Sequence, residues 1–295
     1  MSAKPLSPIK VPLGECYVAK IDAQLSRSYR GMLASAGFAA VLLVSTPALA
    51  ATAPALLTNS NYGVVSDTWN DTASSPVTGA GCTTTLAGTP TVTVGVGNPT
   101  PLVPCPVQNG TDQGSALATL NGQACTSLGG GAVALNTINL GGVAGVFTPD
   151  CYSSGGGMSI GAGTVNLNGA GVYVFKSAGT FTTANNTNVT VTGGACEADV
   201  FWAPGAATTL GANTTFKGSI LDGVGNAITV GTTTSIIGRL LSYGGVVTTD
   251  TDTIAIPTCT TVYPASIPTL SEWAMIAFSL LIAGLSVLML RRRQI

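Results

Sequence analysis

The chain has 295 residues, no histidine and a formal net charge of −1, and only 8% of its residues are charged. This near-neutral total hides an uneven distribution, because eight of the eleven basic residues lie before residue 31 or after residue 290. Residues 51–272 carry three basic and ten acidic side chains, a formal charge of 3 − 10 = −7. An acidic central part argues against nucleic acid and anionic membrane surfaces as its partners.

The first 50 residues predict an export signal. Residues 33–46 form an apolar run of signal-peptide length, and Ala48-Leu49-Ala50 has the small residues of a cleavage site. A translation start at Met32 is an alternative, but it would discard the long basic leader. That leader contains Lys4, Lys10, Lys20, Arg27 and Arg30. We therefore expect a signal helix within residues 1–50 and an exported chain that begins near Ala51.

Residues 51–134 are rich in Thr, Pro and Gly and predict irregular first coils that start or cap a larger β structure. Residues 111–128 break this pattern and predict one helix along its flank. Thr111 is the expected N-cap, Asp112 favours the first turn, and the glycines at 129–131 end the helix. The apolar residues at helical spacing are Ala116, Leu117, Leu120, Ala124 and Leu128.

Residues 135–256 consist of short pieces rich in Val, Ile and Thr, which favour strands over disorder. Comparable pieces recur at intervals of 18 to 23 residues, which suits one solenoid coil of three short strands. They begin at Thr164, Thr187, Thr208, Ile228 and Val246. Glycines at expected corners, such as Gly211 and Gly231, are predicted to supply the backbone angles of tight bends. A β-sandwich is the alternative, but its longer strands and less regular turns fit this spacing less well.

Six cysteines remain in the exported part once Cys16 in the leader is set aside. An even number in an exported chain predicts disulfides, and six cysteines allow fifteen pairings. Proximity in the sequence favours Cys82–Cys105 and Cys125–Cys151 as local links, with Cys196–Cys259 fastening the end of the domain. Without histidine or a C-x-x-C pair, we expect no zinc site and no cofactor.

The C-terminal residues follow an expected linker at 257–266 and combine a short motif, an apolar run and a basic end. The apolar run at 274–290 reaches the short end of membrane-spanning length, and flanking arginines and tryptophan suit the two interfaces. The short motif consists of Ile267, Pro268, Thr269, Leu270, Ser271, Glu272 and Trp273, and the basic end consists of Arg291, Arg292 and Arg293. The segment 267–295 resembles the IPTL-type sorting signal of Gram-negative bacteria. This resemblance implies a transmembrane helix in the inner membrane, an exosortase-like sorting enzyme as partner, and transfer to the cell surface.

A second resemblance covers the β-rich part. Five pieces occur in order, at 145–149, 171–175, 199–202, 216–221 and 238–242, and the set is similar to the ice-binding-protein-like domain of bacteria and fungi. The similarity is close over 135–254 and looser over 55–134, where extra cysteines leave the first coils less defined. It implies a mainly β fold: a right-handed β-solenoid of triangular cross-section with one long α-helix alongside.

The resemblance also suggests ice as a ligand. Stacked coils repeat at about 4.7–4.9 Å and alternate strand residues at about 6.6–6.8 Å, so a flat threonine face would present a regular grid of hydroxyl and methyl groups. Such a grid could hold ordered water that merges with a crystal. The candidate residues are Thr183 with Asn186 (a T-A-x-N piece seen in the family), Thr190, Thr209, Thr215, Thr233 and Thr248.

Two other classes compete with ice binding: a surface or matrix structural protein on the same scaffold, and a polysaccharide-active enzyme like the pectate lyases. Catalysis has little support, because the commonest general base is missing without histidine. Asp250 and Asp252 could act as paired carboxylates or hold Ca²⁺, but we expect them to keep the last coil soluble.

The few cations and the aromatic residues predict internal structure more than a binding surface. Lys217 and Arg239 are about one coil apart, and we expect them to stack and pair with Asp222 or Asp199. Strand alternation predicts that the aromatic side chains mostly point inward, which argues against a sugar-binding face. These aromatics are Phe175, Phe181, Phe201, Trp202 and Phe216.

Overall fold

The computed structural model describes residues 50–93, 100–259, 276 and 278–282. The expected signal helix, the sorting motif at 267–273, the arginines at 291–293 and most of the expected anchor at 274–290 lie outside these residues. Within the described part, no helix combines the length and apolar character that crossing a membrane requires.

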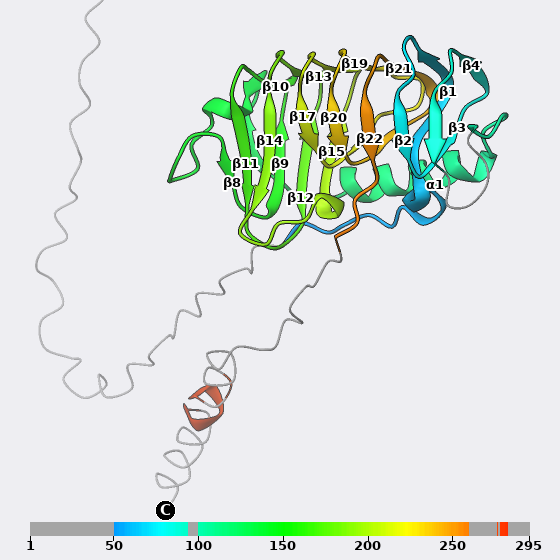
Figure 1. Ribbon diagram of the computed structural model, residues 1–295. Coiled ribbons are helices and arrows are strands. Elements are labelled where there is room, and N and C mark those ends of the chain that lie inside the picture. Colours follow the sequence, from blue (N-terminus) through cyan, green and yellow to red (C-terminus); the bar gives the residue numbers. More distant parts are fainter. Residues whose placement is uncertain (1–49, 94–99, 260–275, 277, 283–295) are drawn as a thin grey trace, which may run out of the picture. The chain divides into compact units, whose positions relative to one another are not determined.

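Short strands, all paired in parallel, wind into a solenoid with three faces, which we name a, b and c (Figure 1). Two strands are long because each turns a corner and contributes to both face a and face b: β1 (Tyr62–Asp71) and β21 (Leu240–Thr249). The first residues of β21 pair with β18 on face a, while Val247 and Thr248 pair with β19 on face b.

The remaining strands belong to one face each. Face a contains β3 (Ala80–Cys82), β6 (Thr126–Gly129), β9 (Asp150–Ser154), β12 (Tyr173–Ser177), β15 (Val200–Pro204) and β18 (Ser219–Leu221). Face b contains β4 (Thr85–Ala87), β7 (Val133–Ala134), β10 (Met158–Ile160), β13 (Phe181–Thr183), β16 (Thr208–Leu210) and β19 (Ile228–Val230). Face c contains β2 (Pro76–Thr78), β5 (Thr91–Thr93), β8 (Val146–Phe147), β11 (Thr164–Asn168), β14 (Asn188–Thr192), β17 (Thr215–Lys217), β20 (Ser235–Ile237) and β22 (Thr253–Ala255).

The coils do not stack in sequence order. The strands of residues 62–93 form coils of the solenoid, and β1 pairs along its length with β21, so the first coils stack on the last one (Figure 1). Register shifts interrupt β1 between Ser66 and Thr68 and between Tyr62 and Val64, so these coils are less regular than most of the others. The residues whose spacing predicted the coil repeat lie on two different faces. Thr164 begins β11 and Thr187 precedes β14, both on face c, whereas Thr208, Ile228 and Val246 lie on face b.

The interior between the three faces is filled by one apolar cluster that runs the length of the solenoid. Stacked aromatic rings form its centre, with Trp202 between Phe175 at 4.4 Å and Phe181 at 4.8 Å between ring centroids. Most aromatics therefore point inward as predicted. Phe201 is an exception, because it points out of face a into a second apolar cluster. Rings in contact add packing stability beyond the burial of their area.

Helix α1 (Val107–Asn121) supplies the other side of that second cluster and lies along face a (Figure 1). It begins after Pro106 without a side-chain cap and ends at Gly122, so the expected span of 111–128 was displaced, and Thr111 is not its N-cap. Tertiary contacts set the true start: Asn109 bonds with Asn59, and Gln113 bonds to the backbone of Asp222 and Tyr243.

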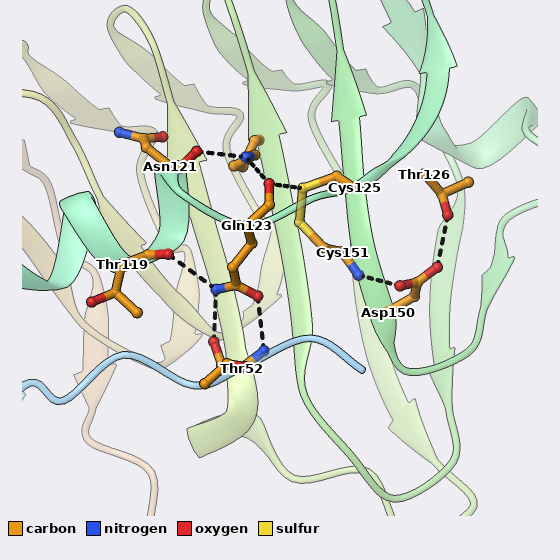
Figure 2. Close-up of a disulfide and its surroundings, with 9 residues drawn as sticks. Thr52, Thr119, Asn121, Gln123, Cys125, Thr126, Asp150 and Cys151 are labelled. Carbon is orange, nitrogen blue, oxygen red and sulfur yellow. Dashed lines mark hydrogen bonds between the residues drawn. A yellow bond between two sulfur atoms is a disulfide. The ribbon is translucent and has the colours of Figure 1, made fainter. Parts of the chain in front are cut away.

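Two disulfides fasten face a just outside the ends of α1. Cys82 of β3 joins Cys105 before the helix, and Cys125 after it joins Cys151 of β9 (Figure 2). Near the second link, Lys176 donates hydrogen bonds to the carbonyl oxygens of Asn121 and Gln123 at 3.1 and 2.9 Å. A cation at a helix C-terminus satisfies carbonyls that lack helical partners. Together these contacts hold the helix against face a.

Glycines do occupy the corners, but the expected reason, that they supply the backbone angles of tight bends, was wrong for Gly211 and Gly231. Gly211 and Gly231 do not have positive φ angles; instead, a Cβ at either position would lie 2.5–2.6 Å from the backbone of the neighbouring coil. These glycines are needed because adjacent coils approach closely. Left-handed backbone occurs a little further along the same corner, at Asn186, Asn213 and Thr233.

Candidate functional site

The three faces differ in what lies outside them. Outward residues of face a, including Val65, Val174 and Leu241, are buried under α1 and the segment that precedes η1 (Leu57–Asn61). Face a is therefore occupied by the chain itself. Faces b and c remain as candidate binding surfaces.

Across six adjacent strands, face b presents one hydroxyl or amide residue per strand, and Ala134 and Ala87 occupy the same register position at the two ends. The backbone register pairs Ser159 with Thr182, Thr182 with Thr209, Thr209 with Thr229, and Thr229 with Thr248. Asn70 continues the row beside Thr248. We call these six residues the b row. Thr182, Thr209 and Thr229 are exposed, and the other three are half-buried.

Alternation along each strand of face b explains why the b row points outward. In β13, Phe181 and Thr183 are buried on either side of exposed Thr182, and β16 and β19 repeat the pattern with buried Leu210 and Val230. The inward residues fill the core, so the outward ones cannot rotate away from solvent without unpacking it. The outward positions of the described b strands carry no charged side chain. Face b is thus an uncharged, rigid surface with a coil repeat of about 4.8 Å.

The corner between faces b and c is fixed by a second regular feature. Asn186, Asn213, Thr233 and Thr251 all have φ angles of 55–58°, and each donates its backbone N–H to the adjacent coil. Beneath them, the buried hydroxyls of Thr187 and Thr234, for example, donate to carbonyl oxygens of the same corner. This buried ladder holds the edge of face b in register.

Face c also has a row of polar residues, but it is less uniform. Thr164, Asn188, Thr215, Ser235 and Thr253 are in register. Beside this row lie Lys217, which pairs with Glu197 at 3.4 Å, and then Ile237. Several polar side chains of face c bond to one another, because Thr190 and Thr192 both donate to Asn166.

The sequence-predicted ice-binding residues do not share one face. Thr209 and Thr248 lie in the b row, Thr190 and Thr215 lie on face c, and Asn186 and Thr233 lie at the corner between them. Thr183 is buried and its hydroxyl oxygen accepts the N–H of Gly211, so it cannot reach a surface ligand. Thr182 and Thr229 were missed, although inward Phe181 and Ile228 already fix their outward direction by alternation.

Asp252 does not solubilise the end of the solenoid. It is fully buried because the coil of residues 62–78 covers it, and its oxygens accept the N–H groups of Thr234 and Asp250 at 2.8 Å. Burial raises the pKa of Asp252 to about 6, and that of Asp222, buried near the corner between faces a and b, to about 6. These carboxyls are structural hydrogen-bond acceptors.

Neither of the two cations has Asp222 as its partner. Lys217 pairs with Glu197, while Arg239 is buried and donates to the carbonyl oxygen of Ser60 and the hydroxyl of Ser219. Asp222 instead accepts hydrogen bonds from Thr208 and Asn226. Burial lowers the pKa of Arg239 to about 10.

All three expected cysteine pairs are joined in the structure, including Cys196–Cys259. Among the described residues, the one grouping with metal-ligand spacing is Cys196, Glu197 and Cys259. Its sulfur atoms are bonded to each other, so they are not available as thiolate ligands. This grouping therefore offers no free thiolate to a metal ion.

Comparison with known proteins identifies the family. The ice-binding-like family profile matches residues 52–255, which is more than half of the chain. The chain belongs to the ice-binding-like family. A profile of the IPTL-CTERM motif matches residues 265–293 of this ice-binding-like chain.

Curated and solved relatives agree with this family. An ice-binding protein of Nostoc sp. (strain HG1) is 29% identical over 247 residues, covering 79% of this chain and 84% of the relative. The crystal structure of an ice-binding protein from an Antarctic biological consortium has a TM-score of 0.58 at 22% identity, covering 70% of this chain and 92% of that one. An ice-binding protein from an Arctic yeast has a TM-score of 0.59 at 18% identity, with 72% and 98% coverage. The solved structures share the fold of this ice-binding-like chain.

Proposed function

We propose that this chain is a non-catalytic ice-binding protein that contacts ice through face b. The b row carries the proposal: it places one hydroxyl or amide group per coil on an open, uncharged surface. Relatives named ice-binding proteins support the choice of ligand. Because the row is held by a packed core, little conformational entropy is lost when it orders water or meets a crystal. Face c carries an ion pair and Ile237, which interrupt such a grid.

Bulky substitutions on the two open faces test this assignment. Thr209→Tyr and Thr229→Tyr place rings in the middle of the b row, while Thr215→Tyr places the same ring on an exposed strand position of face c. We expect thermal hysteresis and inhibition of ice recrystallisation to be lost in the first two variants and retained in the third. Loss only in Thr215→Tyr would move the site to face c.

A second outcome bears on the ligand itself. If the unsubstituted protein leaves growing ice crystals unshaped at high concentration, ice is not the ligand. The same scaffold would then serve as a structural or adhesion protein at the cell surface.

We further propose that the chain is exported by a signal peptide within residues 1–50, anchored in the inner membrane by a helix at 274–290, and handed to the surface by an exosortase-like enzyme. The IPTL-CTERM match supports this route. N-terminal sequencing of the mature protein should begin near Ala51. Truncation before Ile267 should leave the exported chain soluble in the periplasm of a Gram-negative host; its appearance at the cell surface would contradict tail-dependent sorting.

A further inference from the structure

The chain leaves the solenoid at the edge between faces c and a. Strands of face c continue into strands of face a across this edge, for example from β14 through η3 (Glu197–Asp199) into β15. The last strand, β22, ends at the same edge. Because the solenoid has three faces, this edge lies opposite face b. The continuous described chain therefore ends, at Cys259, on the edge opposite the b row.

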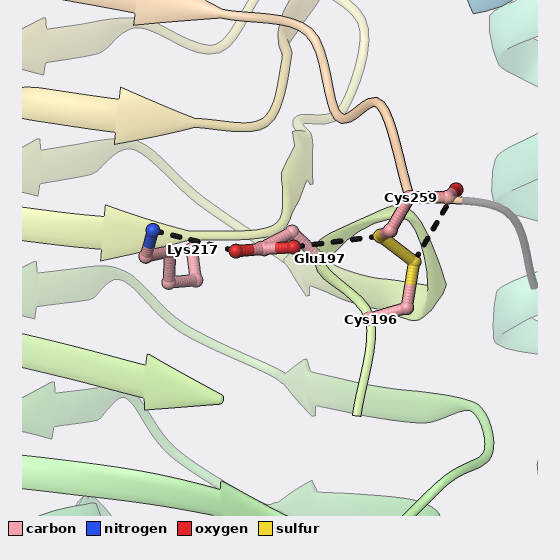
Figure 3. Close-up of polar contacts among 4 residues, drawn as sticks. All are labelled: Cys196, Glu197, Lys217 and Cys259. Atoms are coloured by element: carbon pink, nitrogen blue, oxygen red, sulfur yellow. Dashed lines mark hydrogen bonds and ion pairs between the residues drawn. A yellow bond between two sulfur atoms is a disulfide. The ribbon is translucent and has the colours of Figure 1, made fainter. Parts of the chain in front are cut away.

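The Cys196–Cys259 disulfide changes where this tail is attached. Residues 256–259 follow β22, but Cys259 is bonded to Cys196 between β14 and β15 (Figure 3). On face c, β22 and β14 are separated by β20 and β17. The chain therefore runs back along the edge before it leaves. Glu197, next to Cys196, pairs with Lys217 of β17, so the segment that receives Cys259 is also held by the neighbouring coil.

These contacts decide how force would enter the fold. We propose that the Cys196–Cys259 disulfide is the mechanical attachment point of the C-terminal tail, which carries load past β22 into the middle of the solenoid. This inference rests on the proposed tethering, since a molecule held by its tail and gripping ice through face b is pulled between the two.

Without the disulfide, tension on the tail would act directly on β22. Its residues 253–255 pair with β20, and residues 254–255 pair with β2. Such a short strand peels one or two hydrogen bonds at a time, and each of these bonds by itself contributes little stability. With the disulfide, the covalent bond takes the load first. The 63-residue separation between the two cysteines is then protected from extension, which corresponds to about 200 Å of chain.

Force spectroscopy on the full chain in detergent, held by handles at its two ends, tests the proposal without ice or a sorting system. We compare the unsubstituted chain with the Cys196→Ser/Cys259→Ser variant. The variant should show an early event in which β22 peels, at a force about twofold or more below the first event of the unsubstituted chain. Equal first forces and no early event would overturn the proposal.

A second arm keeps all disulfides, so it does not depend on the folding of the variant. A protease site inserted at residues 256–258 is cut after folding, which leaves the tail joined to the solenoid only through Cys196. The proposal expects the first unfolding force to be unchanged by the cut. A fall in that force would show that residues 256–258 and β22 bear the load. Loss of ice activity in the b-row variants is measured separately, so failure of either idea can be recognised alone.

Discussion

Faces a and b belong to the same coils and share the two long strands β1 and β21, yet their outward residues have opposite character. Face a points Val174, Phe201 and Leu241 outward under α1, whereas face b points Thr182, Thr209 and Thr229 into solvent. The backbone pairing is parallel on both. Helix α1 covers the apolar outward residues of face a, so faces b and c are the ones left free to bind.

The largest expected effect is the loss of packing under the helix. Phe201→Ala removes a ring that is 2% exposed between face a and α1, and we expect it to lower the free energy of unfolding by about 3–5 kcal/mol. Thr209→Ala on face b should change it by no more than about 0.5 kcal/mol. Urea unfolding followed by circular dichroism measures both. Similar costs on the two faces would remove the distinction between a covered and an open face.

The helix contact can be tested with two glycines of α1. A Cβ at Gly110 would lie 2.5 Å from the ring of Tyr243, whereas one at Gly114 would meet nothing within 4 Å. We expect Gly110→Ala to destabilise the fold by about 1–3 kcal/mol because the helix must move away from face a. Gly114→Ala should stabilise it by about 0.5–1 kcal/mol through helix propensity. Thermal unfolding of the pair compares the two signs, and a stabilising Gly110→Ala would contradict close packing.

Two buried carboxyl groups at the edges of face b, those of Asp222 and Asp252, predict that the free energy of unfolding depends on pH. Burial raises the folded-state pKa of Asp222 and Asp252 from 3.8 to about 6, so the folded protein binds more protons than the unfolded chain between these values. The free energy of unfolding should therefore fall as pH rises from 4 to 7, by about 1–3 kcal/mol for each group. Asp252→Asn should reduce this slope. A slope that is unchanged in this variant would contradict the assignment.

Asp112 acts in the opposite direction. Hydrogen bonds from Thr58 and Gln108 hold the pKa of Asp112 below its usual value. Its contribution to stability is present above pH 3.8 and is lost as the pH falls through the lowered pKa. Below pH 4, the free energy of unfolding of Asp112→Asn should therefore depend less on pH than that of the unsubstituted protein. Urea unfolding at several pH values measures both.

The smallest expected effect on stability accompanies a large effect on function. Thr229→Ser keeps the hydroxyl of the b row and removes one exposed methyl group, so the free energy of unfolding should change by about 0.5 kcal/mol or less. We expect reduced thermal hysteresis, because the methyl is half of the hydroxyl-and-methyl grid. The matched Ser235→Thr on face c adds a methyl and should leave hysteresis unchanged. An increase in the second variant would assign a role to face c.

Local residue patterns were enough to predict much of the architecture. Alternation of Val, Thr and aromatic residues predicted short strands and inward rings, and proximity predicted the same cysteine pairs that the structure joins. The same alternation, applied strictly from Phe181, would have placed Thr183 inside and Thr182 outside. Thr183 was predicted as a surface residue instead of Thr182 because the T-A-x-N piece was interpreted as a surface motif, although its first residue belongs to the core.

Three features depended on contacts between residues far apart in the sequence. The first coils stack on the last one because β1 pairs with β21, and no local pattern reports a partner about 180 residues away. The coil of residues 62–78 buries Asp252, whereas the sequence alone predicts that Asp252 is exposed and keeps the last coil soluble. Helix α1 begins at Val107 because Asn59, Asp222 and Tyr243 bond to its polar side chains.

Residue type and short spacing were enough to predict the short strands, the IPTL-type motif and the family. The export signal stays a prediction. Which faces are open depends on contacts between residues that are far apart in the sequence. Strand alternation shows that a residue points outward, but it does not show whether a helix packs over that residue. The stacking order and the path of α1 settle that question, and they leave the b row open on the side opposite the edge that carries Cys259.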